Sequence, residues 1–211
     1  MREILVALAG SPNVGKSTLF NRITGGNVHV ANWAGVTLQR YEGSLSYSGR
    51  RLRIVDLPGT YSLSARDLGE KVALDFIINE KPDVLVIVVD ATELEKSLYL
   101  AVESMELYGK VVIALNMMDA AEKRGIHINF DGLERSLDVP VVPISALKGI
   151  GIGKLMRAIL EVAEGRAGRK EPLRVDYDGL ERYIAKLSEL DHGNYPARWA
   201  ALKILEGSIP P

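Results

Sequence analysis

Residues 10–17 (GSPNVGKS) match the pattern G-x-x-x-x-G-K-[ST], whose residue types are suited to binding phosphate. Glycines allow backbone N–H groups to close around phosphate oxygens, and a helix that begins at the end of the motif adds favourable partial positive charge. The Lys16 amine can reach the β- and γ-phosphates of a nucleoside triphosphate, and the Ser17 hydroxyl can bind Mg²⁺. We therefore predict a phosphate site with contacts from Asn13, Val14, Gly15, Lys16, Ser17 and Thr18.

A carboxylate in a later segment complements this loop. Asp56 ends an apolar stretch and is followed by Leu57-Pro58-Gly59. Alone, Asp-x-x-Gly is a common turn sequence. The phosphate motif is more specific, because a chance match is expected in only about one random chain of this length in a hundred. Together, the two motifs place Asp56 to hold Mg²⁺, commonly through water, and Gly59 to offer its N–H to a γ-phosphate.

Two further polar motifs follow later apolar segments and are suited to a purine base. The first is Asn116-Met117-Met118-Asp119, and the second is Ser145-Ala146-Leu147-Lys148. A carboxylate such as Asp119 can accept both N1–H and the exocyclic amine of guanine, whereas adenine offers no such pair of donors. We expect Asn116 to brace the loop and the Ala146 N–H to bind guanine O6. The expected base contacts are Asn116, Met117, Asp119, Ser145, Ala146 and Leu147.

All these motifs must be positioned by one sheet, because short apolar segments alternate with amphipathic stretches along the chain. Such segments are typical of strands buried on both faces of a parallel sheet. Ser48-Gly49-Arg50 separates two of them as a hairpin turn would, which adds one antiparallel edge strand. We predict an α/β fold with a mostly parallel six-stranded sheet. The strands are expected at 4–9, 41–47, 53–56, 84–90, 111–116 and 141–144, with helices including 17–24, 68–79, 95–108 and 153–162.

The last part of the chain differs in composition from the rest. Residues 165–172 (GRAGRKEP) are basic and punctuated by glycine and proline, as linkers often are. Helices are expected at 177–190 and 196–205. We therefore predict a nucleotide-binding domain at 1–164, a linker at 165–173 and a small helical segment at 174–211. Two helices make a poor independent domain, so we expect this segment to be truncated or to depend on the first domain.

Composition excludes several classes of function. The chain of 211 residues has a net charge of −1, which argues against a broad nucleic-acid surface, and we expect no nucleic-acid partner. It has no cysteine, which excludes disulfides and thiolate metal sites. Its three histidines, His29, His127 and His192, are too dispersed to indicate a metal site. The apolar runs are shorter than the roughly 20 residues that span a bilayer, so we expect a soluble segment.

The order of these motifs resembles the Ras-like GTPase superfamily, and the resemblance implies a P-loop GTPase fold. Thr37 is similar to the switch I threonine that coordinates Mg²⁺ and senses the γ-phosphate, with switch I at 27–38 and switch II at 59–67. Loss of the γ-phosphate would then release both loops. The resemblance places the catalytic machinery at Asn13, Lys16, Thr37 and Gly59, and the Mg²⁺ ligands at Ser17, Thr37 and Asp56.

Two departures from the superfamily pattern affect these expectations. Met117 stands where the guanine motif usually carries lysine, so the packing of that lysine against the phosphate loop is expected to be missing. Thr60 stands where many relatives carry a glutamine that positions water, so we expect slow intrinsic hydrolysis. In a potassium-activated subset, an asparagine that matches Asn13 helps to bind K⁺ near the transferred phosphate. The sequence leaves open whether Asn13 binds K⁺ or only turns the loop.

A more specific resemblance extends over nearly the whole chain. It is to the N-terminal cytosolic part of the FeoB family of prokaryotic ferrous-iron transport proteins, and it is carried by residues 10–20 (GSPNVGKSTLF), 32–37 (NWAGVT), 56–63 (DLPGTYSL), 90–92 (DAT), 116–119 and 197–207 (ARWAALKILEG). The resemblance implies a helical domain beyond about Leu173 that stabilises the GDP-bound form, with membrane helices following. It places the chain at the cytoplasmic face of the cell membrane, bound to GTP or GDP and joined to a membrane-spanning part. Whether the chain forms a homo-oligomer is left open.

Two other classes of function fit part of the sequence. Soluble GTPases of the Era/Der type, which assist ribosome assembly, share the same phosphate loop, and residues 165–168 (GRAG) formally match the G-x-x-G of an RNA-binding KH module. The surrounding KH pattern is missing. A nucleotide sensor that binds GTP without hydrolysing it would also fit a switch II that lacks the glutamine.

Overall fold

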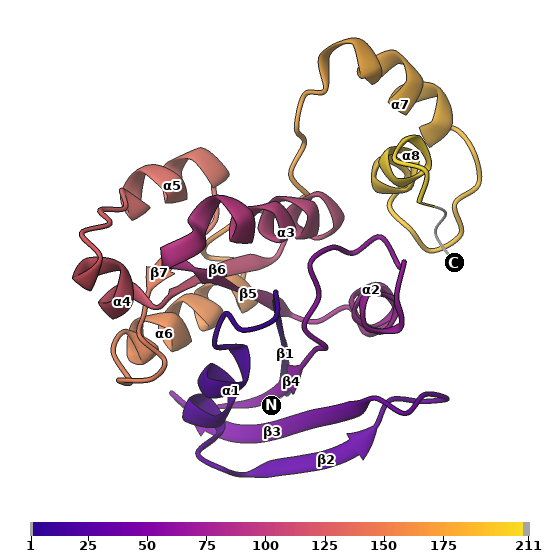
Figure 1. Ribbon diagram of the computed structural model, residues 1–211. Coiled ribbons are helices and arrows are strands. Elements are labelled where there is room, and N and C mark those ends of the chain that lie inside the picture. The colour runs from indigo at the N-terminus through magenta and orange to yellow at the C-terminus, as the bar shows by residue number, and fades with distance from the viewer. Residues whose placement is uncertain (1, 209–211) are drawn as a thin grey trace.

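Within residues 2–208, which the computed structural model describes, seven strands form one mixed sheet. Their order across the sheet is β2-β3-β4-β1-β5-β6-β7 (Figure 1). The strands are β1 (Ile4–Gly10), β2 (Val28–Asn32), β3 (Gln39–Tyr47), β4 (Arg50–Asp56), β5 (Val84–Asp90), β6 (Val111–Asn116) and β7 (Val141–Pro143). Strands β4, β1, β5, β6 and β7 are parallel, so their carboxyl ends lie along one edge.

The parallel centre of the sheet follows from the residue types of its strands. All residues of β6 are buried, and so are the first six of β5, as expected for β-branched and aliphatic runs covered on both faces. Along β1, Ala7 and Ala9 face one core cluster, while Val6 and Leu8 face another. The alternation of side chains in a strand therefore divides the apolar core into two layers, one on each face.

The prediction of six strands was wrong by one, because residues 28–32 form strand β2. This strand pairs antiparallel with β3, with Val30 opposite Tyr41, and lies at the edge of the sheet. Strand β3 is the antiparallel strand that the hairpin predicted, but it is covered by β2 and is not the edge. Four of the five residues of β2 are exposed, so the segment lacks the apolar pattern by which the other strands were predicted.

Helices cover both faces of the sheet. Residues of α2 and α3 pack in the first core cluster with the partly buried side of α5, and residues of α1 and α6 pack in the second. The helices are α1 (Lys16–Thr24), α2 (Leu68–Glu80), α3 (Leu94–Leu107), α4 (Met118–Lys123), α5 (Phe130–Leu137), α6 (Ile152–Ala163), α7 (Glu181–Ser188) and α8 (Ala197–Leu205), with short 3₁₀ turns η1 (Ala91–Glu93) and η2 (Asp178–Leu180). No helix in residues 2–208 is both long and apolar enough to cross a membrane.

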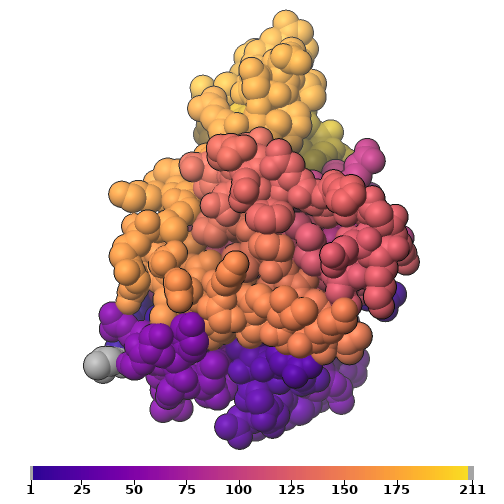
Figure 2. Space-filling model, turned by 90° about the vertical axis from the view of Figure 1, so that its left-hand side faces the viewer, coloured from indigo at the N-terminus to yellow at the C-terminus, as the bar shows by residue number. Residues whose placement is uncertain are grey.

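The helical segment stands out from one end of the molecule but is anchored to the first domain (Figures 1 and 2). Helices α7 and α8 form a small core of their own around Ile184, Ala201 and Leu202. Trp199 of α8 is 2% exposed and belongs to the large core cluster of the domain. Beside it, the Lys203 ammonium binds the carboxylate of Glu103 on α3, and both side chains are almost fully buried.

The buried pair formed by Lys203 and Glu103 predicts a large effect on stability. Lys203→Met would leave the Glu103 carboxylate buried without its cation, which should lower the free energy of unfolding by about 3 kcal/mol. Chemical denaturation of the purified protein measures this difference. The double variant Glu103→Gln/Lys203→Met carries no buried charge at this site and should recover most of the loss.

The pH dependence of this effect is also fixed by the pair. Burial alone would lower the pKa of Lys203, but the Glu103 and Glu206 carboxylates outweigh it and raise that pKa above its ordinary value of 10.5. A group whose pKa is raised in the folded state stabilises the protein fully at pH values below its unfolded-state pKa. This stabilisation is lost as the pH rises through the folded-state pKa. The difference between wild type and Lys203→Met should therefore stay constant from about pH 7 to 9 and shrink only above about pH 10.5. A difference within about 0.5 kcal/mol of zero at pH 8 would contradict the prediction.

Candidate functional site

The phosphate loop joins β1 to α1 at the carboxyl edge of the sheet. Asn13 and Gly15 adopt left-handed backbone conformations, with φ of 69° and 86°, and turn the loop around its centre. Such angles favour asparagine and glycine. A Cβ atom at Gly15 would collide with the amide nitrogen of Asn116, so glycine is required here by close approach as well as by φ. Ser17 and Thr18 are exposed in the first turn of α1.

The sheet brings Asp56 beside this loop. Strand β4 is the parallel neighbour of β1, with Asp56 opposite Leu8, so the carboxylate lies at the same edge. The Lys16 amine binds Asp56 and donates to the Leu57 carbonyl at 2.6 Å, and the Ser17 hydroxyl donates to the second oxygen of Asp56 at 3.2 Å. A hydroxyl and a carboxylate oxygen that meet in this way are the donors that Mg²⁺ prefers, so the residues present fit the ion.

Switch II begins directly against the phosphate loop. Gly59 lies beside Pro12, since an added Cβ would be in ordinary contact with the proline backbone at 3.5 Å, and Thr60 donates its N–H to the Gly10 carbonyl at 3.3 Å. The Thr60 side chain is buried. The end of switch II is fixed at Asp67, which caps α2 by accepting from the Glu70 N–H at 2.8 Å.

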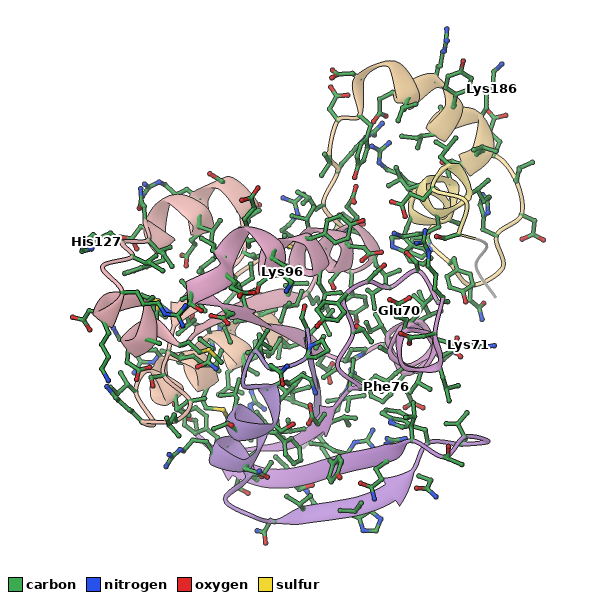
Figure 3. All side chains as sticks on the ribbon, in the orientation of Figure 1. Glu70, Lys71, Phe76, Lys96, His127 and Lys186 are labelled. Atoms are coloured by element: carbon green, nitrogen blue, oxygen red, sulfur yellow. The ribbon has the colours of Figure 1, made fainter. Side chains whose placement is uncertain are left out.

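Switch I is anchored at Trp33, and Thr37 is exposed. Trp33 is 7% exposed and contacts Phe76 edge-on, with ring centroids 5.5 Å apart, while the Arg40 guanidinium lies 4.8 Å from the Trp33 ring. Phe76 points from α2 toward the strands, whereas Lys71 of the same helix points to solvent (Figure 3). Because β2 takes up residues 28–32, the loop predicted at 27–38 is shorter than expected. No hydrogen bond within residues 2–208 joins Thr37 to Ser17 or Asp56.

Asn116 connects the phosphate loop to the segment after β7. Its side-chain amide donates to the Val14 carbonyl at 2.8 Å, and its carbonyl oxygen accepts from the Ala146 N–H at 2.9 Å. These two bonds join the phosphate loop to the segment after β7, as the expected bracing role of Asn116 requires. The Ala146 N–H, which we expected to bind guanine O6, is already used by this bond.

Asp119 presents an ionised carboxylate in the next turn. The Ser145 hydroxyl and the Lys148 ammonium, which lies 3.2 Å from the carboxylate, hold the pKa of Asp119 below its ordinary value. The Ser145 side chain is buried, whereas the neighbouring Leu147 is 75% exposed. The carboxylate is thus held ready to accept hydrogen bonds from a base, and Leu147 offers an apolar surface beside it.

Met117, which stands where lysine is usual, lies beside the phosphate loop. Met117 adopts φ of 63° at the start of α4, and its terminal methyl carbon lies 3.7 Å from the position of a Cβ on Gly15. The flexible thioether chain therefore fills the space beside the loop without carrying a charge.

Two residues that contact the predicted loops were not predicted from the sequence. Glu103 accepts from the Ser62 hydroxyl at 3.1 Å and from the Leu63 N–H at 3.0 Å, both in switch II, while it also binds Lys203. Helical spacing places Glu103 on the same face as Leu100 and Leu107, and a carboxylate on an apolar face could have indicated it. Arg22 donates to the carbonyls of Ala146 and Leu147. No sequence pattern indicates this contact, because it joins residues more than 120 positions apart.

Comparisons with known proteins agree with this geometry. Residues 4–159 match the family model of ferrous iron transport protein B. The chain is 40% identical to the Fe(2+) transporter FeoB of Escherichia coli K12 over 217 residues, which cover 99% of this chain and 28% of that protein. The chain therefore spans just over a quarter of the length of that relative.

Solved structures match as well. The cytosolic domain of the Thermotoga maritima FeoB iron transporter in a GDP form superposes with a TM-score of 0.92 at 37% identity, covering 98% of this chain and 83% of that one. The GMPPNP form of the same domain gives a TM-score of 0.90 at 38% identity, covering 97% and 82%. Because the family model covers most of the chain, the protein belongs to the ferrous iron transport protein B family.

Proposed function

We propose that this chain is the GTP-binding and GTP-hydrolysing regulatory domain of a prokaryotic ferrous-iron transporter. The observation that carries the proposal is the convergence of Lys16, Ser17 and Asp56 at one edge of the sheet, linked through Asn116 to the base-binding residues. The relatives support it, because T. maritima FeoB was solved in GDP and GMPPNP forms, and GMPPNP is an analogue of GTP.

The phosphate half of the site would bind the triphosphate through Lys16 and the N–H groups of the loop. Ser17 and Asp56 would hold Mg²⁺ with Thr37 and Gly59 approaching from the two switch loops, and the ion would neutralise charge on the β- and γ-phosphates. The amine of Lys16 sits on a flexible stem between Asp56 and the Leu57 carbonyl, from which it can turn to phosphate oxygens. Exposed Thr37 lies on the segment that would have to move inward.

The base half of the site would select guanine. The Asp119 carboxylate would accept from N1–H and the 2-amine, and the exposed Leu147 would cover one face of the ring. Adenine carries no such pair of donors and would leave the carboxylate unpaired, which is costly in a partly buried site.

Hydrolysis is proposed to be slow. Thr60 is buried and bonded through its N–H to Gly10, so its side chain is poorly placed to orient water. We include K⁺ as an activator, because the exposed Asn13 side chain lies in the phosphate loop and carries a carbonyl oxygen suited to such an ion. The left-handed backbone at Asn13 also supports the simpler role of turning the loop.

The helical segment is proposed to slow the release of GDP. Glu103 binds switch II through Ser62 and Leu63, and it binds the helical segment through Lys203. Arg66 of switch II also reaches Ser208 at 3.4 Å. A switch II tied to a packed helix in this way would be slow to open.

The whole transporter is proposed to place this domain at the cytoplasmic face of the membrane. The coupled activity would be passage of Fe²⁺ through a membrane-spanning part of the same polypeptide, since relatives such as the E. coli transporter are far longer than this chain. Family membership favours this assignment over a ribosome-assembly GTPase.

The first prediction tests guanine recognition. Wild type with Mg²⁺ should convert GTP to GDP slowly and leave ATP intact, while Asp119→Asn should prefer xanthosine triphosphate, because the acceptor pair becomes a donor and an acceptor. A loss of GTP affinity of about 100-fold is expected from the unpaired polar groups. Nucleotide titration and phosphate release measure both steps. Retained guanine preference in Asp119→Asn would refute the base site, and tight GTP binding without any GDP formed over hours would support a non-catalytic sensor.

The second prediction concerns potassium. If Asn13 contributes to a K⁺ site, replacing Na⁺ by K⁺ should raise the single-turnover rate of wild type by about ten-fold or more, since one positive charge at the transferred phosphate has an effect of this order. Asn13→Ala should abolish that difference while leaving GDP affinity within about two-fold. Equal rates in the two salts would show that Asn13 does not bind an activating K⁺ and only turns the loop.

The third prediction concerns the helical segment. Lys203→Met should speed the release of a fluorescent GDP analogue by about five-fold or more, because a buried contact that holds switch II is weakened. Arg50→Ala, which removes an exposed arginine that binds Glu164 at 2.8 Å, serves as the control. Release from a folded Lys203→Met protein at the wild-type rate would argue against control by this segment.

A further inference from the structure

The loop between β7 and α6 is held on its outer side by an arginine of α1. Arg22 Nε donates to the Ala146 carbonyl at 3.2 Å, and Arg22 Nη2 donates to the Leu147 carbonyl at 2.7 Å. Gly149 of the same loop lies against the guanidinium, since an added Cβ there would be 3.6 Å from Arg22 Nε. Within residues 2–208, no carboxylate forms an ion pair with Arg22, so its hydrogen bonds serve this loop.

The remaining contacts of this loop, residues 145–150, come from other sides. Ser145 and Ile150 close its neck by two backbone hydrogen bonds of 3.0 and 3.1 Å. The side-chain carbonyl oxygen of Asn116 accepts a hydrogen bond from the Ala146 N–H at 2.9 Å. The Lys148 ammonium lies 3.2 Å from Asp119, and Arg22 is the side chain that holds the carbonyls of Ala146 and Leu147.

Peptide geometry shows what this orientation achieves. In a trans peptide the C=O and the following N–H point in opposite directions. A guanidinium that draws the Ala146 carbonyl toward α1 therefore turns the Leu147 N–H away from α1. The same holds for the Leu147 carbonyl and the Lys148 N–H, which donates to the Ser145 hydroxyl at 3.3 Å. The Ala146 N–H is already bonded to Asn116, so the Leu147 N–H is the donor that the loop can offer to a base carbonyl.

We propose that Arg22 is a positioning residue for guanine specificity, which fixes the loop so that the Leu147 N–H can bind the O6 atom of the base. This rests on the proposed guanine site. In this role Arg22 acts through the loop, because its guanidinium fork lets one side chain hold two successive carbonyls. The bond to the Leu147 carbonyl is exposed and the bond to the Ala146 carbonyl is only partly buried, so water can replace Arg22 at least at Leu147, and the fold should lose little stability.

The test compares two nucleotides that differ along the hydrogen-bonding edge of the base. GDP carries O6 and N1–H, whereas 2,6-diaminopurine riboside diphosphate keeps the 2-amine, replaces O6 by an amine and has an unprotonated N1, so it should bind more weakly and offers no O6 to the Leu147 N–H. Arg22→Ala should weaken GDP binding about ten-fold and speed its release equally, since the contribution of about one well-oriented hydrogen bond is lost. Binding of the diaminopurine nucleotide should change by less than about two-fold. Arg22→Lys, whose single ammonium cannot hold both carbonyls, should lie between Arg22→Ala and wild type.

Arg50→Ala is the matched control, because it removes a surface arginine that is paired with Glu164 away from the base loop. Equal weakening of both nucleotides in Arg22→Ala, or unchanged GDP binding, would overturn the proposal. A large fall in the melting temperature without a selective loss of GDP binding would instead show that Arg22 mainly stabilises the fold, and would also overturn the proposal. If wild type does not prefer GDP to ADP, the proposed function itself fails, whatever Arg22 does.

Discussion

The site depends on the parallel pairing of β4, β1, β5, β6 and β7, which brings the carboxyl ends of these strands to one edge. The phosphate loop follows β1, Asp56 ends β4, and Asn116 ends β6. These side chains are far apart in sequence, and the register of the sheet alone places them within hydrogen-bonding reach. Asn116 then fastens the edge together, because its one amide group bonds the phosphate loop and the base loop at once.

The motifs were predictable from the sequence because each depends on local chemistry that its residue types and their spacing indicate. A glycine-rich loop before Lys16 and a carboxylate after an apolar strand have few other uses in that order. The parallel strands were predictable for a similar reason, since β5 and β6 are runs of aliphatic residues. Strand β2 was not, because an exposed edge strand needs no apolar alternation and is held by its pairing with β3.

The parts of the site that sequence did not show are those that depend on tertiary contact. The packing of the usual lysine was expected to be missing at Met117, but a long flexible side chain is enough to lie beside Gly15. The Ala146 N–H was expected to face a base, yet its partner depends on where the Asn116 carbonyl oxygen points. Glu103 and Arg22 reach partners about 40 and 124 residues away, and no spacing rule predicts such pairs.

These contacts divide the site into a rigid half and an adjustable half. The base loop is bonded at its neck, by Asn116 and by Arg22, so its donors are fixed before any base arrives. The phosphate half instead meets two loops: Thr37 is exposed beyond the Trp33 anchor of the first, and the second, switch II, is held by the Glu103 carboxylate that also binds α8. Helix α1 joins the halves, since Lys16 and Arg22 stand six residues, or about 9 Å, apart along it. A rigid base site with movable phosphate loops lets one nucleotide stay bound while the loops respond to its third phosphate, which is the physical requirement of a switch.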